Sequence, residues 1–316
     1  MKQHITRAYN TFSINDLDGT ITKSSPETRL SNEINYYRDI SATLHNIHFP
    51  RYVTSSFEEG VYHLELEYYA YDNLGDFMVY GDFEESFWVN VASSLDGVLK
   101  KFSQTTSNKD FSQYAEAMYI DKTQRYYTEL LENPKFAVVN KHESLKIDGK
   151  NYLNFDRIWE DVQKEIKKQL LPLKDASVIH GDMCFSNILC AVNEKTDTYI
   201  LKFVDPRGNF GEDGIYGDPL YDYAKLVHSY NGGYEYIIYD QFAIDENHDL
   251  SKFDLTFSND NKTKISTIFQ EFDDPKATLI EGLIYIGMCS RHYDSLKRQT
   301  AMYTTGIRLL NEALEK

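Results

Sequence analysis

The chain contains few cysteines, and their spacing does not match a pattern for a shared metal site or a disulfide framework. Its three cysteines, Cys184, Cys190 and Cys289, form no Cys-x-x-Cys pair. This excludes a disulfide framework and a cysteine-based zinc site, and it is typical of a reducing compartment. We therefore expect a cytoplasmic protein.

Long apolar runs and an excess of positive charge are also missing. No apolar stretch approaches the length that spans a bilayer, and the first residues, MKQHITRAYN, lack the apolar core of a signal peptide. The chain has 33 Lys and Arg against 49 Asp and Glu, a formal net charge of −16, whereas nucleic-acid-binding proteins normally present a basic face. We expect neither a membrane span nor a nucleic-acid partner, and the sequence leaves the oligomeric state open.

Two apolar runs each end in a polar cluster that carries a carboxylate. Residues 178–190 read VIHGDMCFSNILC and contain Asp182 and, five residues later, Asn187; residues 201–208 read LKFVDPRG and contain Asp205. Phosphoryl transfer from ATP needs a carboxylate that orients the attacking hydroxyl and accepts its proton, and oxygen ligands that hold magnesium against the phosphates. Protein kinases supply these groups in the same order and spacing.

The pattern HGDxxxxNIL, followed by a strand and an aspartate, resembles the aminoglycoside phosphotransferase and choline kinase family. Residues 217–224, GDPLYDYA, are similar to the next signature of that family. The resemblance implies an α+β, bilobal protein-kinase-like fold with a small antiparallel-sheet N-lobe (residues 1–72) and a larger, mainly helical C-lobe (residues 73–316). It also implies ATP and Mg²⁺ as cofactors and a small-molecule hydroxyl acceptor as partner.

The resemblance assigns roles to residues of the two clusters. Asp182 is expected to be the catalytic base, although a turn aspartate that caps a helix is the alternative. His180, the second catalytic candidate, is expected to brace the loop beside it by hydrogen bonds, and a part in proton transfer is the alternative. Asn187 and Asp205 are expected to hold magnesium. Arg207 is expected either to reach a phosphate or an acidic group of the substrate, or to pair with a nearby carboxylate.

Cys184 lies within the first cluster but has no evident basic partner, so we interpret it as a packing residue. The GDPLYDYA signature supplies two supporting aspartates. Asp222 matches the aspartate that braces the catalytic loop through backbone N–H groups, and Asp218 is expected to be a helix N-cap.

A lysine on a strand and a glutamate on the next helix are expected near the N-terminus. Residues 8–25 alternate polar and apolar around Asp-Gly, which predicts a β-hairpin whose second strand carries Lys23. A helix beginning near Pro26 carries Glu33. The resemblance implies that Lys23 binds the α- and β-phosphates and that Glu33 orients it; an exposed lysine and a solvated helix face are the alternative.

No Gly-rich loop precedes Lys23, which departs from the family pattern. The cover of the γ-phosphate is expected from residues 4–10 or from other groups. Residues 48–53 and 61–71 predict two further strands. At the end of the second, Glu67, Tyr68 and Tyr69 are candidates for the connector whose backbone pairs with adenine.

The remainder of the chain is predicted to be mainly helical. Helical periodicity begins near residue 84 and returns at 114–131 and 155–171, with a small hairpin in 141–151. Residues 245–264 are interpreted as a polar region, and helices resume at Pro275.

The acceptor is expected to be a sugar, a polyol or an amino alcohol. Residues 204–234 are similar to bacterial phosphotransferases found with capsule or lipopolysaccharide biosynthesis, whereas choline would need an aromatic cage. Tyr230, Tyr234 and Tyr236 are candidates for such a cage, and a tyrosine-rich core explains them equally well.

Two other function classes remain open. Residues 16–22, DLDGTIT, match the DxDGT signature of haloacid-dehalogenase-type phosphatases, with Asp16 as nucleophile and Asp18 beside it. That chemistry requires a buried parallel strand before Asp16, but the preceding residues alternate and end polar, and short motifs match by accident. A catalytically silent nucleotide-binding protein is the third class, because the Gly-rich loop is missing.

Overall fold

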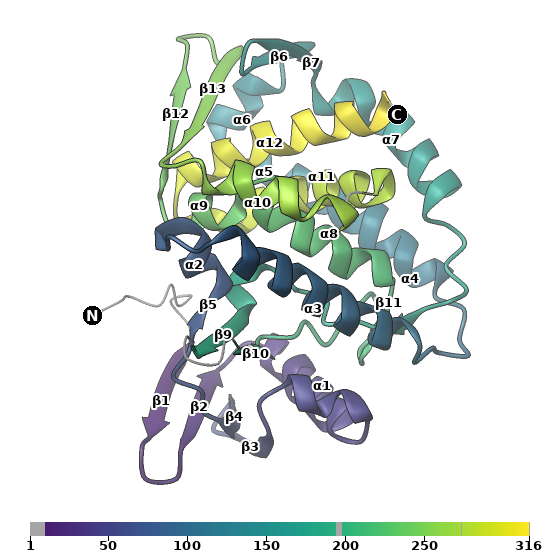
Figure 1. The fold of residues 1–316 in the computed structure, drawn as a ribbon. Coiled ribbons are helices and arrows are strands. Elements are labelled where there is room, and N and C mark those ends of the chain that lie inside the picture. The colour runs from purple at the N-terminus through teal and green to yellow at the C-terminus, as the bar shows by residue number, and fades with distance from the viewer. Residues whose placement is uncertain (1–9, 194–197, 273, 316) are drawn as a thin grey trace.

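The computed structural model describes residues 10–193, 198–272 and 274–315. The chain forms a small N-terminal part, built on one antiparallel sheet, and a larger, mainly helical part (Figure 1). This is the α+β architecture that the sequence predicts. The boundary near residue 72 stays a prediction; there, β5 (Asp72–Asn73) already pairs with a strand of the larger part, β9 (Ile188–Asn193).

The N-terminal sheet has the strand order β1-β2-β4-β3, and all its neighbours are antiparallel. The hairpin turn predicted at Asp18-Gly19 is present, and Gly19 has the positive φ of 64° that such turns require. One face of the sheet is covered by α1, which buries an apolar stripe against β3 and β4. The elements of this part are β1 (Thr11–Asn15), β2 (Thr20–Ser25), α1 (Arg29–Ser41), η1 (Leu44–His48), β3 (Tyr52–Glu58) and β4 (Val61–Glu67).

The strand predicted at residues 48–53 is displaced toward the C-terminus. Residues 44–48 form the 3₁₀ helix η1, because the side chain of Thr43 accepts a hydrogen bond from the N–H of His45 and caps it. Pro50 has no N–H to give to a ladder, and β3 begins only at Tyr52.

The phosphatase alternative disagrees with the structure. The strand before Asp16 is β1, which pairs antiparallel with β2 and is exposed along its whole length. Asp16 and Asp18 lie in the exposed hairpin turn after it. A nucleophilic aspartate of that class would instead follow a buried parallel strand.

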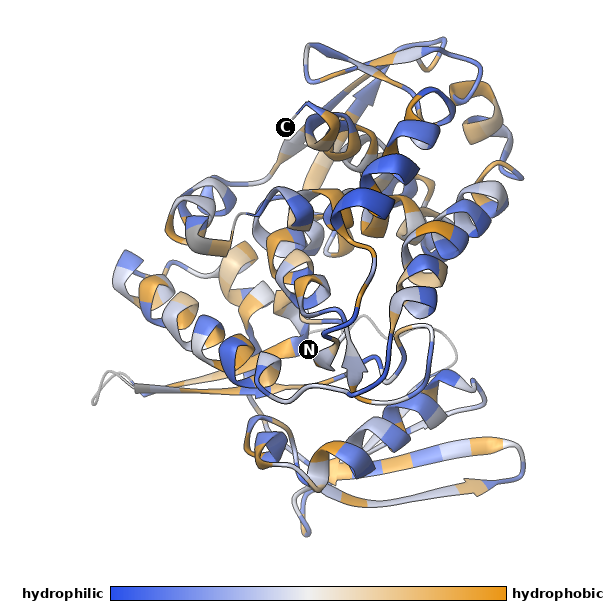
Figure 2. Ribbon diagram, turned by 90° about the vertical axis from the view of Figure 1, so that its right-hand side faces the viewer, coloured by the Kyte–Doolittle hydropathy of each residue, from blue (hydrophilic) through white to orange (hydrophobic). Residues whose placement is uncertain are grey.

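The larger part consists mostly of amphipathic helices, and Figure 2 shows hydrophilic and hydrophobic segments alternating along most of them. Its helices are α2 (Leu74–Tyr80), α3 (Glu85–Ser103), α4 (Ser112–Glu116), α5 (Lys122–Leu130), α6 (Pro134–Val139), α7 (Phe155–Gln169), α8 (Pro219–Tyr230), α9 (Tyr234–Ile238), α10 (Asn261–Ile268), α11 (Pro275–Cys289) and α12 (Leu296–Leu314). The helix expected at 114–131 is α4 and α5 joined by a π-helical turn, Ala117–Asp121.

One helix of the larger part is buried on nearly all sides. Only a few residues of α11 near its N-terminus and near its end are accessible, and it packs against α5, α8 and α12. Short strands lie between the helices. They are β6 (Ser144–Ile147), β7 (Lys150–Leu153), β8 (Ser177–Val178), β10 (Thr198–Phe203), β11 (Tyr216–Gly217), β12 (Phe242–Glu246) and β13 (Lys252–Phe257).

The polar region expected at residues 245–264 is more ordered than predicted. It contains the end of the hairpin β12–β13 and the start of α10, and β13 also pairs in parallel with β6. The sequence signal for the strand β13 is the alternation of polar and apolar residues in 252–257, KFDLTF. In the structure Phe253 is buried and Lys252 is exposed. Among the described residues, no helix combines the length and apolarity needed to cross a membrane.

Candidate active site

The first polar cluster forms a tight loop between β8 and β9. Gly181 has a φ of 78°, and a Cβ atom on it would come within 2.7 Å of the Cβ of Arg207, so both the backbone conformation and the space favour glycine. The N–H of Arg207 donates to the carbonyl of His180 at 2.9 Å. The two polar clusters are thus joined through their backbones.

Asp222 braces this loop from the first turn of α8. Its two carboxylate oxygens accept the backbone N–H groups of His180 and Gly181, at 2.6 Å and 2.7 Å. Burial raises the pKa of Asp222 to about 7, and the two hydrogen bonds oppose this shift by favouring the carboxylate. This is the supporting geometry expected for Asp222. Asp218 is also the N-cap of α8, since its side chain accepts from the N–H of Leu220.

A second brace, which the sequence reasoning missed, holds the end of the loop. The N–H of Phe185 donates to Ser229 Oγ at 2.9 Å, and the N–H of Ser186 donates to Glu235 Oε1 at 3.0 Å. Ser229 in turn donates to Glu235. The available signal was Glu235 itself, a carboxylate flanked by two tyrosines in the aromatic run of residues 232–242.

His180 is held by backbone atoms on both sides of its ring. Nδ1 accepts the N–H of Asp182 at 3.2 Å, and Nε2 donates to the carbonyl of Val204 at 3.0 Å. Burial lowers the pKa of His180 to about 4, so the ring is neutral near pH 7, as these two hydrogen bonds require. This geometry fits bracing of the loop and leaves no ring nitrogen for proton transfer.

Asp182 forms an ion pair with Lys225 of α8, with 2.8 Å between Oδ1 and Nζ. Burial alone would raise the pKa of Asp182, but the ammonium of Lys225 outweighs it and lowers the pKa to about 2. The carboxylate is therefore ionised and able to accept a hydrogen bond over the whole physiological range. Lys225 was missed by the sequence reasoning, although it lies three residues after Asp222 on the same helix face.

The structure brings Lys23, Glu33 and Asp205 together. Lys23 Nζ lies 2.7 Å from Glu33 Oε2 and 2.6 Å from Asp205 Oδ1. Burial raises the pKa of Glu33 to about 7 against the opposing effect of Lys23, while for Asp205 the effect of Lys23 exceeds that of burial and lowers the pKa. The lysine of the N-terminal sheet thus contacts carboxylates from α1 and from the second polar cluster.

Helix α1 is anchored directly to both polar clusters. Tyr36 donates its hydroxyl to the carbonyl of Ile179 at 2.9 Å. Gly208 approaches the backbone of α1 so closely that a Cβ atom there would lie 2.2 Å from the carbonyl oxygen of Asn32. These contacts fix the position of Glu33 relative to the catalytic loop.

Asn187 and Asp205 are the candidate magnesium ligands. The Asn187 amide nitrogen donates to the carbonyl of Asp182 at 2.9 Å, which leaves its oxygen as the ligand atom, and the Asp205 side chain is 49% exposed. Within the described ranges, no group of three or more His, Cys, Asp and Glu side chains is arranged to hold a metal. Two oxygen ligands fit a magnesium ion whose other ligands are phosphate oxygens and water.

Arg207 does not pair with a carboxylate among the described residues. Its Nε donates to the carbonyl of Asn209 at 2.8 Å, and Nη2 lies 4.0 Å from the sulfur of Met118. The expected pairing of Arg207 with a carboxylate of the chain is therefore wrong, while contact with a phosphate or with an acidic group of the substrate stays a prediction.

The candidate adenine connector lies at the end of β4. Glu67 is the last residue of the strand, and the N–H of Tyr68 extends the ladder by donating to the carbonyl of Gly19. Tyr69 donates its hydroxyl to Glu67 Oε2 at 2.9 Å. Residues 68–71 then lead without regular structure into β5.

Two further expectations are resolved by the burial of the residues concerned. Cys184 is buried, and burial raises the pKa of its thiol, which fits packing. Tyr230 and Tyr236 are also buried, with their hydroxyls donating within the core to Phe269 and Asn259, so an aromatic cage that includes them is wrong. The lid expected from residues 4–10 lies almost entirely outside the described residues.

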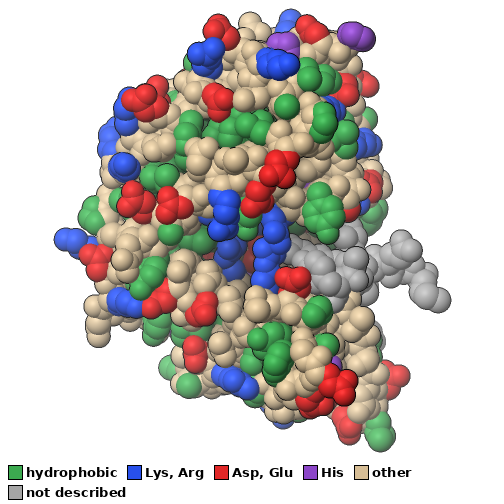
Figure 3. Space-filling view, turned by 180° about the vertical axis from the view of Figure 1, so that it is seen from behind, with side chains coloured by type: hydrophobic (Ala, Val, Ile, Leu, Met, Phe, Trp, Pro, Cys, Tyr) green, Lys and Arg blue, Asp and Glu red, His purple; other side chains and the backbone are tan. Residues whose placement is uncertain are grey.

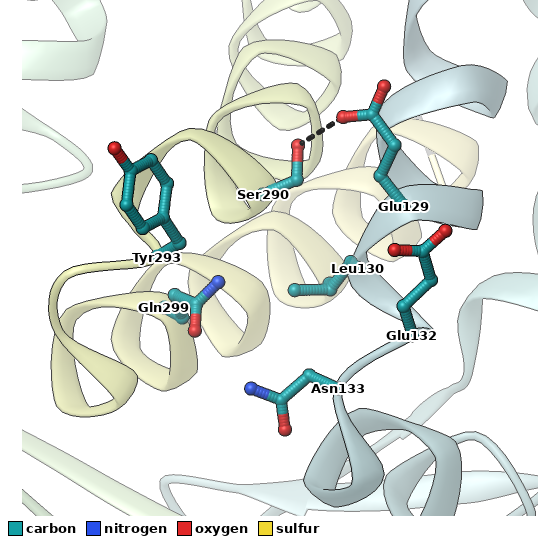
Figure 4. Close-up of a pocket in the computed structure, with 7 residues that line it drawn as sticks. All are labelled: Glu129, Leu130, Glu132, Asn133, Ser290, Tyr293 and Gln299. Atoms are coloured by element: carbon teal, nitrogen blue, oxygen red, sulfur yellow. Dashed lines mark hydrogen bonds between the residues drawn. The ribbon is translucent and has the colours of Figure 1, made fainter.

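The site lies in a hollow between the two parts, where Lys and Arg side chains gather (Figure 3). A cavity of about 350 Å³ lies elsewhere, between the end of α5 and the turn from η5 (Ser290–His292) to α12 (Figure 4). Its lining includes Glu129, Asn133, Tyr293 and Gln299 but no residue of either polar cluster. We therefore assign no part of the candidate site to it.

The fold matches solved aminoglycoside phosphotransferases, while sequence comparison alone finds no relative. No protein-family model and no curated protein matches the chain. Aminoglycoside phosphotransferase APH(4)-Ia superposes with a TM-score of 0.58 at 10% identity, covering 99% of this chain and 93% of the other. A thermostable mutant of it, in a ternary complex with ADP and hygromycin B, gives 0.55 at 10% identity, covering 93% and 86%. The chain therefore has the kinase-like fold of these enzymes, as the sequence resemblance implied.

Proposed function

We propose that the chain is an ATP-dependent phosphotransferase that moves the γ-phosphoryl group to a hydroxyl of a small molecule. One observation supports this function above the others. Asp182, Asn187 and Asp205, from two loops, share one site with Lys23 from the opposite part, and a kinase needs these groups together. The similarity to a solved enzyme in complex with ADP agrees with a nucleotide as the phosphoryl donor.

In the proposed reaction, Asp182 accepts a hydrogen bond from the acceptor hydroxyl and orients its oxygen toward the γ-phosphorus. The new P–O bond forms as the bond to the β-phosphate oxygen breaks; the hydroxyl proton passes to Asp182, and ADP leaves. The low pKa of Asp182 suits a base that acts late, when the hydroxyl is already losing its proton to a forming phosphoester.

The nucleotide is held by the other group of residues. Lys23 binds the α- and β-phosphates with Glu33 fixing its direction, and the backbone of residues 67–69 faces the adenine. Asn187 and Asp205 would hold Mg²⁺, which when bound neutralises the charge on the β- and γ-phosphates. Since Lys23 contacts Asp205 at 2.6 Å, the incoming nucleotide replaces that ion pair with contacts to the metal and the phosphates.

The function is tested by incubating the protein with ³²P-labelled ATP, Mg²⁺ and a panel of sugars, polyols and amino alcohols. Transfer of label to at least one hydroxyl compound, lost in Asp182→Asn and retained in Asp16→Asn, is expected. Binding of Mg²⁺–ATP without transfer to any compound would favour a silent nucleotide-binding protein. Absence of nucleotide binding would reject both functions.

A further inference from the structure

Three cationic side chains, Lys225, Lys122 and Arg207, gather beside Asp182. Lys225 contacts Asp182 directly. The ammonium of Lys122, at the start of α5, lies 5.9 Å from the ring centroid of Tyr221, which precedes Lys225 by one turn of α8. Arg207 reaches Met118, which precedes Lys122 by one helical turn. These four-residue spacings make the three cations neighbours.

The charges in this group do not balance. Asp182 is the carboxylate paired with Lys225, and Asp222 is occupied by two backbone N–H groups. In the part of the chain that the structure describes, neither Lys122 nor Arg207 forms an ion pair with a carboxylate. A cluster in which two of three cations have no carboxylate partner runs against the formal net charge of −16 of the whole chain.

Holding like charges together is unfavourable unless an opposite charge joins them. Lys122 is partly buried, and this burial together with repulsion from Arg207 and Lys225 lowers its pKa well below the usual range. An anion bound between these groups would favour the protonated form of Lys122, because its attraction to the cations would offset their mutual repulsion. The nucleotide-binding group, in contrast, already pairs Lys23 with two carboxylates.

We propose that the acceptor carries an anionic group, a carboxylate or a phosphate, in addition to the hydroxyl that is phosphorylated, and that Lys122 and Arg207 bind this group. This inference rests on the proposed phosphotransferase function and narrows its acceptor class. The anion fixes the acceptor with its hydroxyl at Asp182, while Lys225 stays on the catalytic carboxylate. An amine-bearing acceptor would instead add positive charge to a site that already has an excess.

The test compares acceptors of related structure that carry different charges. Glucose, glucosamine, gluconate and glucose 6-phosphate form one set, and glycerol, glycerate and glycerol 3-phosphate form another. With labelled ATP, we expect an anionic member to exceed its neutral counterpart at least 10-fold in kcat/KM. The carboxylate and phosphate members distinguish the two anions. Higher kcat/KM for a neutral or amine member, or no anionic member phosphorylated or bound, overturns the proposal.

The matched variants are Lys122→Met and, as a control, Lys141→Met, which removes an exposed lysine after α6. Lys122→Met is expected to raise KM for the anionic acceptor about 10-fold or more, with little change in kcat, in KM for ATP or in turnover of the neutral counterpart. Lys122→Arg is expected to restore part of the loss. An increase in KM for ATP alone would assign the cations to the nucleotide and overturn the proposal.

Stability supplies a second readout that separates binding from a structural role. Because its neighbours repel Lys122, Lys122→Met is expected to leave Tm unchanged or to raise it; a lowered Tm with equal loss for all acceptors would contradict the proposal. Calorimetric binding of gluconate against glucose, in the presence of a non-hydrolysable ATP analogue, does not require turnover. If the phosphotransferase function fails while gluconate still binds through Lys122, the anion site stands without it.

Discussion

The two aspartates of the site are each paired with a lysine, but the two pairs differ in where the lysine comes from. Asp205 contacts Lys23 of the N-terminal sheet, whereas Asp182 contacts Lys225 of α8, which also carries the brace for its loop. The first pair joins two parts of the molecule, and in the proposed reaction it gives way to contacts with the metal and the phosphates. The second lies within one part, and in the proposed reaction it is kept. We therefore call the Lys23–Asp205 pair exchangeable and the Lys225–Asp182 pair fixed.

The largest expected effect tests the fixed pair through its carboxylate. Asp182→Asn should lower kcat by about 10²–10⁴-fold, because the amide cannot accept the hydroxyl proton. The affinity for Mg²⁺–nucleotide should stay within a few-fold, as measured by calorimetry. Asp16→Asn, in the exposed hairpin turn, is the control and should match the wild type. Full turnover in Asp182→Asn would remove this residue from the mechanism.

Asp205→Asn tests the exchangeable pair. We expect about a 100-fold weaker affinity for ATP in the presence of Mg²⁺, because a charged ligand of the metal is lost. With EDTA in place of Mg²⁺, the difference between variant and wild type should shrink. If the variant binds Mg²⁺–ATP as tightly as the wild type and only kcat falls, Asp205 is not a metal ligand.

Lys225→Met tests two effects of Lys225 on Asp182: holding the carboxylate in place and lowering its pKa. The variant should lose roughly 10-fold in kcat, since Asp182 is no longer held in place. Its acid limb should also move to higher pH, because the pKa of Asp182 is then no longer lowered to about 2. The pH profile of kcat checks this, with Lys141→Met as the charge-matched control. An unchanged acid limb of the pH profile, together with a reduced kcat, would contradict the electrostatic role assigned to Lys225.

The smallest expected effect concerns stability and not turnover. The pKa of His180 falls from the ordinary 6.5 to about 4 in the fold, so the unfolded chain binds a proton that the native state excludes. The contribution of His180 to the free energy of unfolding is fully present above pH 6.5. It is lost as the pH falls from there toward 4, by an amount on the order of 3 kcal/mol. Urea midpoints of His180→Asn should depend less on pH over this window than those of the wild type. The exposed His248→Gln should show the wild-type dependence.

The sequence predicts best those features that are local. The order of Asp182, Asn187 and Asp205 reflects loops next to strands, and the turn at Gly19 reflects a single residue with positive φ. Both features depend on residues that are near one another in the chain, so residue type and spacing are enough to predict them. The fold followed from the same motifs, since they are similar to a family whose architecture they imply.

The missed features depend on side chains brought together from distant segments. Lys225, Glu235 and Lys122 each lie on helices where a charged residue reads as ordinary surface, and only packing turns them toward the catalytic loop. The boundaries at residues 44–52 depended on a capping hydroxyl, Thr43, that competes with strand formation. The aromatic cage failed because helical spacing does not distinguish a tyrosine in the core from one lining a cleft.

The attachment of α1 to both polar clusters has a consequence for how Lys23 is positioned. Through Tyr36 and the close approach of Gly208, this helix is fixed to both clusters, while it also covers one face of the N-terminal sheet. Lys23 on β2 contacts Glu33 of α1 and Asp205 of the second cluster, so its position depends on the sheet, the helix and the loop at once. A substitution that loosens the packing of α1 would therefore disturb both contacts of Lys23 together.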